Sequence, residues 1–186
     1  MASLRITTTH CINIEEAGQD KMEISLKINN PSWKIIYEIP KSTLLIKGRH
    51  GLYHSIVEAT AQIQQRFGCY AWGTAHNLNY IGSFSKDYKN GNHKSNLHGR
   101  IHNYLQNHRL KDNGRKNTNL MVFENINESL LANDITLYIL KFDFLEVDHE
   151  IIDYSKYSED AELVRAVEQL LICSYRRNQQ CIWNRG

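Results

Sequence analysis

Alternating apolar and polar side chains mark two strands near the start of the chain. Residues 22–28 and 33–39 each place an apolar side chain at almost every second position, which is the pattern of a half-buried β-strand. The segment between them, Asn29-Asn30-Pro31-Ser32, has turn chemistry. The pattern therefore predicts a β-hairpin over residues 22–39.

Helical spacing replaces this alternation further along the chain. Apolar residues over 52–67 recur every three or four positions, and Gly68 is placed to end the helix. Two short apolar runs, 69–72 and 78–81, flank a segment of turn-forming residues, which predicts a second hairpin. The polar segment 83–95 predicts an exposed loop.

The second half of the chain contains further helical patterns and one strongly apolar run. Helices are predicted from residue 97 to about 109, over 125–132, and onward from Ser158, whose hydroxyl suits the N-cap position. Residues 135–147 are rich in β-branched and aromatic side chains, which is typical of a strand near the centre of a sheet.

Length and composition limit the possible classes of protein. The 186 residues are enough for one packed domain and scarcely enough for two. No apolar run is long enough to cross a bilayer, and the first residues lack the apolar core of a secretion signal. The four cysteines form no C-x-x-C pair. We therefore expect a soluble, cytoplasmic protein with reduced cysteines and no membrane partner.

The formal net charge of +2 hides an uneven distribution of charge. Residues 86–117 contain eight lysines and arginines against two acidic residues, whereas residues 118–169 contain three basic and twelve acidic residues. Clustered basic side chains are the main source of affinity for nucleic acid. The common nucleotide-binding, zincin and serine-hydrolase motifs are absent from the sequence, and its nine histidines lack the spacing of a zinc site.

A set of residues occurs in an order that resembles a known family. In chain order the set is Gly68-Cys69-Tyr70, Tyr80-Ile81-Gly82, Arg100, Tyr104, Glu168 and Asn184. With this set the sequence resembles the GIY-YIG nuclease superfamily. The second triplet matches the family's motif literally, whereas the first has Cys69 at its central position.

The resemblance implies an α/β (α+β) fold in which a small mixed β-sheet is flanked by helices. It assigns residues 68–186 to a catalytic core of the GIY-YIG type. Residues 1–67 then form an N-terminal extension, a hairpin followed by a helix, that would supply DNA recognition or dimer contacts.

The resemblance also implies an activity, the Mg²⁺-dependent hydrolysis of phosphodiester bonds in DNA, with Mn²⁺ able to replace Mg²⁺. Glu168 is the implied metal ligand, and a single carboxylate suits Mg²⁺ because this ion keeps most of its waters. Arg100 and Tyr104 are implied phosphate contacts, since a guanidinium is an always-charged fork that matches phosphate. Tyr70 is the implied general base and Tyr80 a support for the water or phosphate. A tyrosine with a pKa near 10 is a poor base unless a neighbouring cation lowers that pKa.

Further residues complete the implied site. Lys86 and Asn184 are candidate members of the catalytic set. The basic block would contact the DNA through residues around the loop and helix after Gly82: Lys89, Lys94, His102, Arg109, Lys111, Arg115 and Lys116.

Several interpretations stay open at the level of sequence. A restriction-type or defence nuclease, a homing nuclease and a repair nuclease would share these catalytic residues, and cutting both strands of a duplex would favour a homodimer or a higher oligomer. A non-catalytic nucleic-acid-binding module on the same fold is the alternative to an enzyme. Tyr70 and Tyr80 also have a purely structural interpretation, as aromatic residues paired across a hairpin.

Overall fold

The computed structural model describes residues 9–14, 22–43, 51–63, 65, 67–85, 97–106 and 118–184. In chain order their strands and helices are β1 (Thr9–Ile14), β2 (Met22–Ile28), β3 (Ser32–Ile39), α1 (Gly51–Ala61), β4 (Phe67–Gly73), β5 (Leu78–Ser85), α2 (Leu97–Gln106), α3 (Thr118–Ser129), β6 (Ile135–Lys141), β7 (Phe144–Val147), β8 (Glu150–Asp153), α4 (Tyr154–Tyr157) and α5 (Ala161–Arg177). This mixture of helices and antiparallel strands confirms the α+β class.

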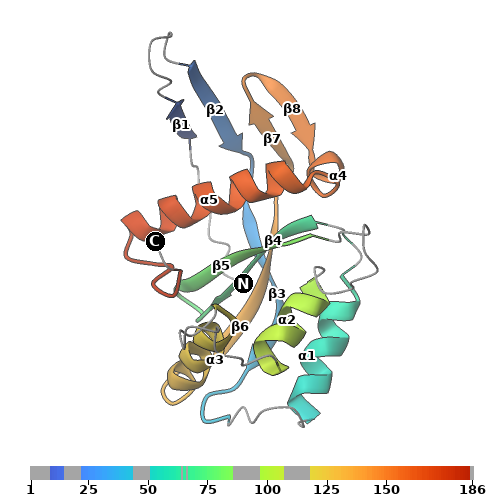
Figure 1. Ribbon diagram of the computed structural model, residues 1–186, viewed down its shortest axis with the longest axis vertical. Coiled ribbons are helices and arrows are strands. Elements are labelled where there is room, and N and C mark those ends of the chain that lie inside the picture. The colour runs from blue at the N-terminus through green and yellow to red at the C-terminus, as the bar shows by residue number, and fades with distance from the viewer. Residues whose placement is uncertain are drawn as a thin grey trace, which may run out of the picture.

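The strands form two four-stranded sheets, with the orders β1-β2-β7-β8 and β3-β6-β4-β5 (Figure 1). Every pairing between described strands is antiparallel, so the expectation of a mixed sheet was wrong. In the second sheet β6 lies between β3 and β4, as its β-branched and aromatic residues predicted. β5 is the edge strand of this sheet, next to the predicted hairpin partner β4.

The hairpin predicted over residues 22–39 was wrong, although both of its strands exist. β2 pairs with β1 and β7, whereas β3 pairs with β6 in the other sheet. Between β2 and β3 the chain passes from one sheet to the other, and between β6 and β7 it does the same. The two connections are joined by backbone hydrogen bonds, since the Asn29 amide donates to the Phe144 carbonyl and the Asp143 amide donates to the Asn29 carbonyl. Asn30 has a positive φ of 47°, and its side-chain Nδ2 donates a hydrogen bond of 2.6 Å to Asp143 Oδ2. The turn-forming residues therefore bend a two-stranded ribbon here and do not reverse the chain.

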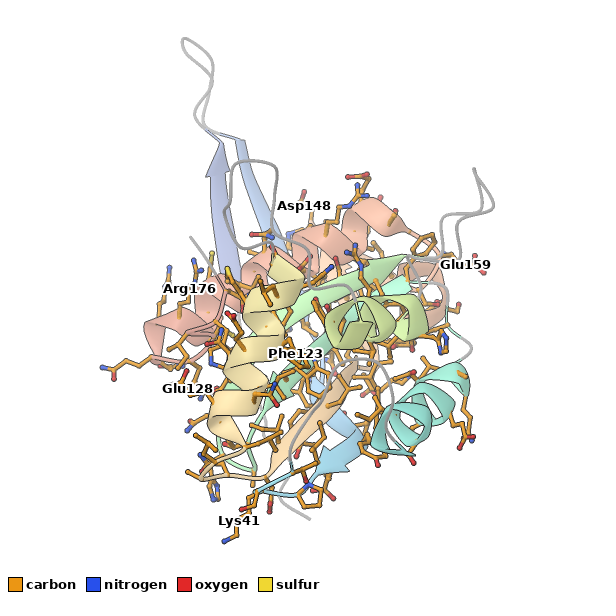
Figure 2. The ribbon with its side chains drawn as sticks, turned by 60° about the horizontal axis from the view of Figure 1, so that its bottom comes forward. Lys41, Phe123, Glu128, Asp148, Glu159 and Arg176 are labelled. Atoms are coloured by element: carbon orange, nitrogen blue, oxygen red, sulfur yellow. The ribbon has the colours of Figure 1, made fainter. Side chains whose placement is uncertain are left out.

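Helices cover both faces of the β3-β6-β4-β5 sheet. Figure 1 shows α5 crossing one face over β4 and β5, with α1, α2 and α3 on the other side. Two buried clusters result, one between the sheet and α1 to α3, the other between the sheet, α4, α5 and the first sheet. Phe123 of α3, which points toward α2 in Figure 2, belongs to the first cluster.

Three helix boundaries differ from the predicted ones. α1 ends at Ala61 and not at residue 67, and α3 begins at Thr118 and not at residue 125. The N-cap of α5 is Asp160 and not Ser158, because the Asp160 carboxylate accepts hydrogen bonds from the amides of Glu162 and Leu163. Ser158 instead lies at the C-terminal end of α4.

The N-terminal strands share sheets with later parts of the chain, since β2 pairs with β7 and β3 with β6. The boundary between residues 67 and 68 stays a prediction. None of the helices in the described ranges is both long and apolar enough to cross a membrane.

Candidate active site

The hairpin of β4 and β5 places Tyr70 and Tyr80 on one face of the sheet. In its register Tyr70 lies opposite Gly82, and Trp72 lies opposite Tyr80, so the two tyrosine side chains project to the same side. Tyr104 of α2 packs onto both rings, with ring centroids 6.2 Å from that of Tyr70 and 6.1 Å from that of Tyr80. The three tyrosines therefore form one cluster over this face of the sheet.

The three hydroxyl groups form one chain of hydrogen bonds. The Tyr104 hydroxyl donates to Tyr80 Oη at 3.1 Å and is hydrogen-bonded to the Tyr70 hydroxyl. Because a hydroxyl has a single proton to donate, Tyr70 is the donor to Tyr104. The chain therefore runs from Tyr70 through Tyr104 to Tyr80, and Tyr80 keeps its own proton for a further acceptor.

Gly82 allows Tyr70 to occupy this position. A Cβ atom added at Gly82 would lie 2.6 Å from Tyr70 Oη and 2.7 Å from its Cζ, closer than real Cβ contacts. The phenol ring of Tyr70 thus lies directly over the backbone of the opposite strand, which only a glycine permits. The last residue of the Tyr80-Ile81-Gly82 triplet is needed for packing of the tyrosine cluster.

The tyrosine cluster is buried, and its burial controls its acidity. Relative exposure is 1% for Tyr70, 2% for Tyr104 and 8% for Tyr80. Burial raises the pKa of all three phenols, and by the largest amount for Tyr70 and Tyr104, because an isolated phenolate is poorly solvated there. The tyrosines of this cluster therefore lack the lowered pKa that a general base requires.

Arg100 is the charged group that acts on the whole cluster. It lies on α2 one turn before Tyr104, with an exposed side chain. Its positive charge lowers the pKa of Tyr70, Tyr80 and Tyr104, in each case by less than burial raises it. An exposed guanidinium beside a set of aligned hydroxyls can bind an anion such as a phosphate.

Glu168 of α5 approaches β5 from the opposite face of the sheet. Its Oε2 accepts a hydrogen bond of 2.6 Å from the Ser83 hydroxyl, and the Ser83 backbone amide also interacts with this carboxylate. Burial raises the pKa of this carboxyl, while the bond from Ser83 and the charge of Arg100 lower it. Glu168 in turn raises the pKa of Tyr80.

The edge position of β5 explains how groups on opposite faces come together. Tyr80 and Ser83 project to different sides of this strand, toward α2 and α5 respectively. Because no further strand follows β5 in the sheet, side chains from both faces can meet around its outer side. The positive charge of Arg100 acts on Tyr80 and on Glu168, so charged groups from α2 and α5 both influence the surroundings of β5.

Asn184 has a defined place on the same edge. Its side-chain oxygen accepts from the Ile81 amide at 2.9 Å, and its side-chain nitrogen donates to the Ile81 carbonyl at 2.7 Å. Ile81 is the central residue of the second triplet, between Tyr80 and Gly82. Asn184 thus holds the backbone of the strand that carries Tyr80 and Ser83.

The remaining predicted residues lie outside the described part of the chain. This applies to Lys86 of the catalytic set and to most of the predicted DNA contacts: Lys89, Lys94, Arg109, Lys111, Arg115 and Lys116. His102 lies on α2, but its side chain is outside the described part as well. Their roles stay predictions.

Sequence reasoning missed Ser83, which holds the Glu168 carboxylate. Its position next to Gly82 was a usable signal, because strand alternation turns it away from Tyr80 and toward the helix on the other face. It also missed that Tyr104 is the centre of the hydroxyl chain. The spacing of four residues between Arg100 and Tyr104 predicted that both lie on one side of α2. It gave no information on which residues the Tyr104 hydroxyl bonds.

The described residues bring few metal-binding side chains together. Among the described residues no group of three or more His, Cys, Asp or Glu side chains comes together, although zinc sites are commonly built from three or four such ligands. A single carboxylate at the edge of a sheet fits Mg²⁺, which binds through one or two carboxylates, water and substrate phosphate. Glu168 supplies such a ligand.

Comparisons with known proteins leave the family undetermined. No protein-family model matches the chain, and neither does any curated protein or solved structure that was searched.

Proposed function

We propose that this protein is a divalent-metal-dependent endonuclease that hydrolyses phosphodiester bonds in DNA, on a core of the GIY-YIG type. The observation that supports the proposal is the convergence of the hydroxyl chain, the Arg100 charge and the Glu168 carboxylate at the outer edge of β5. These groups come from segments far apart in the sequence. Phosphodiester hydrolysis needs a positioned water, positive charge at the phosphoryl oxygens and a ligand for the metal ion, and the three groups could supply these functions together. A restriction-type or defence role, and a homodimeric assembly on the DNA, belong to the same proposal.

Each described residue has a role in this proposal. Arg100 binds a phosphoryl oxygen through its exposed guanidinium. Glu168 would hold Mg²⁺, which supplies positive charge at the phosphoryl oxygens and a more acidic bound water. Ser83 orients Glu168 through the 2.6 Å hydrogen bond. Tyr80 is the least buried member of the hydroxyl chain and keeps a proton to donate, so it contacts the water or the phosphate.

In this proposal Tyr70 lies farther from the reacting groups than Tyr80 does. Its proton is committed to Tyr104 and its ring is buried against Gly82. A direct role as general base would need a change in its surroundings that lowers its pKa, since burial holds that pKa well above 10. Comparing Tyr70→Phe with Tyr80→Phe separates the two roles: the larger loss of turnover identifies the tyrosine that contacts the reacting groups.

The experiment that tests the proposal is cleavage of plasmid and phage DNA by the purified chain in Mg²⁺, in Mn²⁺ and in EDTA. We expect cutting in either metal, none in EDTA, and a loss of at least about 100-fold in Glu168→Gln and Arg100→Ala. Glu162→Gln is the matched control, because Glu162 is an exposed acid on the same helix and is paired with Arg165. This control should cut as the wild type does.

The non-catalytic alternative is supported by one observation, the deep burial of Tyr70 and Tyr104. Such a cluster is also what a packed core requires. Binding of DNA without cutting in either metal, by a chain with native circular dichroism, would establish the binding module in place of the enzyme. Discrete fragments would establish a sequence-specific nuclease, and a smear would establish a non-specific one.

A further inference from the structure

A second candidate site lies away from the tyrosine cluster, on the face of the β3-β6-β4-β5 sheet where α5 packs. It is a pocket of about 260 Å³ between β3, β6, the turn that joins β4 to β5, and the segment after α5. Trp33 and Tyr138 contribute to its wall and pack against the cluster beneath α5. The tyrosines of the candidate active site belong to the cluster on the other face.

The aromatic rings of the pocket are held in place by their own polar atoms. The Trp33 indole nitrogen donates to Tyr175 Oη at 2.7 Å, and the Tyr138 hydroxyl donates to the Thr74 carbonyl at 2.9 Å. These donors are already used, so the two rings contribute apolar surface to the pocket. Fixed aromatic faces favour a flat ligand, because stacking then costs little side-chain entropy.

The polar groups at the pocket offer both donors and acceptors. Gln180 Oε1 accepts from the Leu78 amide at 3.0 Å, which leaves its side-chain NH₂ as a donor. The side chain of Asn77, at the turn, carries one donor group and one acceptor, and Glu38 carries a carboxylate. No lysine or arginine of the described residues lines the pocket.

The side chains that line the pocket favour some classes of flat ligand over others. A phosphate would meet no lysine or arginine in this lining, and its charge would lie near the Glu38 carboxylate. A guanidinium stacks on aromatic rings and pairs with a carboxylate, but it has no acceptor for the amide donors of Asn77 and Gln180. A nucleobase stacks and presents donors and acceptors together along its edge, and Asn, Gln and Glu are side chains that pair with such edges.

We propose that this pocket binds a single nucleobase, stacked against Trp33 or Tyr138 and held at its edge by Asn77, Gln180 and Glu38. The sugar and any phosphate stay outside, where the turn opens to solvent. The base can belong to a free nucleoside or to an unpaired nucleotide of a strand. The proposal does not rest on the nuclease activity, because it uses none of the residues of the candidate active site.

The test is titration of the intact chain with adenosine, guanosine, cytidine and uridine, followed through the indole N–H resonance of Trp33 and by calorimetry. We expect saturable binding of at least one nucleoside. Tyr138→Leu should weaken it by about tenfold or more through loss of stacking, and Asn77→Ala and Glu38→Gln by about threefold to tenfold each. Asn133→Ala, an exposed asparagine in a different turn, is the matched control and should bind as the wild type does.

A second arm identifies the source of the base. The Glu168→Gln variant, which keeps the pocket intact, is mixed with a duplex that contains one unpaired base and with a fully paired duplex. Release of the nucleoside by the first duplex alone shows that the pocket takes a base from a strand, and release by neither shows a site for free nucleosides. The proposal is overturned if the folded wild type binds no nucleoside at millimolar concentration, or if the Tyr138, Asn77 and Glu38 variants all bind as the wild type does.

Discussion

At the scale of single residues, the tyrosine cluster combines packing with a directed hydroxyl chain. Gly82 gives Tyr70 its space, and Tyr104 links Tyr70 to Tyr80. The identity of these residues was accessible from the sequence, because Tyr70, Tyr80 and Arg100 stand in the order of the family they resemble. The direction of the chain was not accessible, since it depends on how α2 packs on the hairpin.

Tyr104→Phe should destabilise the protein and change its response to alkaline pH. Removing the central hydroxyl leaves Tyr70 and Tyr80 without their partner, at a cost of about 1–3 kcal/mol in the free energy of unfolding at neutral pH. The pKa values of Tyr70 and Tyr104 are raised in the folded protein, whereas unfolded tyrosines ionise near about 10. The unfolded state therefore loses protons first, and stability that is intact below pH 10 is lost as pH rises further.

Urea unfolding between about pH 8 and pH 11 measures both effects. The loss of stability above pH 10 should be shallower in Tyr104→Phe than in the wild type, since one buried phenol is gone. Phe84→Leu is the control, because Phe84 packs on Tyr70 in the same cluster but has no ionisable group. It should lower stability and keep the alkaline slope of the wild type. Equal slopes for Tyr104→Phe and the wild type would contradict the assigned pKa shifts.

At the scale of elements, the segment after α5 completes the edge of the sheet. Figure 1 shows the chain turning back from the end of α5 toward β5. Cys181 and Trp183 donate backbone hydrogen bonds to the carbonyls of Leu78 and Asn79, and the Asn184 side chain pairs with Ile81. An uncovered edge strand is prone to pairing with other chains, so this segment both protects β5 and fixes the strand that carries the site.

Asn184→Ala should loosen this edge while the rest of the fold persists. The variant loses both hydrogen bonds to Ile81, and we expect a decrease of about 1–2 kcal/mol in the free energy of unfolding. The Ile81 amide should also exchange its hydrogen faster, which hydrogen exchange followed by NMR detects. Ile182→Ala is the control in the same segment, because that side chain is exposed. Unchanged protection of Ile81 in Asn184→Ala would show that the side chain does not hold the strand.

The elements also show where sequence patterns reach their limit. Period-two alternation located β2 and β3, yet it gave no information on their partners, and the turn-forming Asn29 and Asn30 joined two sheets instead of closing a hairpin. Ser158 and Asp160 both precede acidic residues, and only the observed carboxylate bonds distinguish the true N-cap. Local patterns specify the type of an element, whereas pairing depends on contacts between distant residues such as Asn30 and Asp143.

At the scale of the whole molecule, strands from both ends of the chain share the two sheets, and the proposed site lies on an edge where helices from both faces meet. The segment after α5 covers this edge from Leu78 to Ile81, so a DNA substrate would approach the site past that segment, at the part of β5 that carries Ser83. The predicted DNA contacts come from residues 86–117, the most basic block of the sequence. On either side of Arg100 this block is rich in lysine or arginine, so phosphate binding at Arg100 would be continuous with binding of the DNA backbone along the block.

Replacing Arg115 and Lys116 together by Ala tests this continuity. Each basic residue that neutralises a phosphate releases a counterion, so the slope of log K against log salt should decrease in magnitude by up to about 1.8, and affinity at low salt should fall. A double variant of Lys41 and Lys156 removes the same charge from exposed positions outside the block and should leave the slope near that of the wild type. Fluorescence anisotropy with a labelled duplex over a range of salt concentrations, on the Glu168→Gln background to prevent cutting, measures both slopes. An equal change in the two double variants would show that net charge alone governs binding, whereas a change confined to Arg115 and Lys116 would place the phosphate backbone along the basic block.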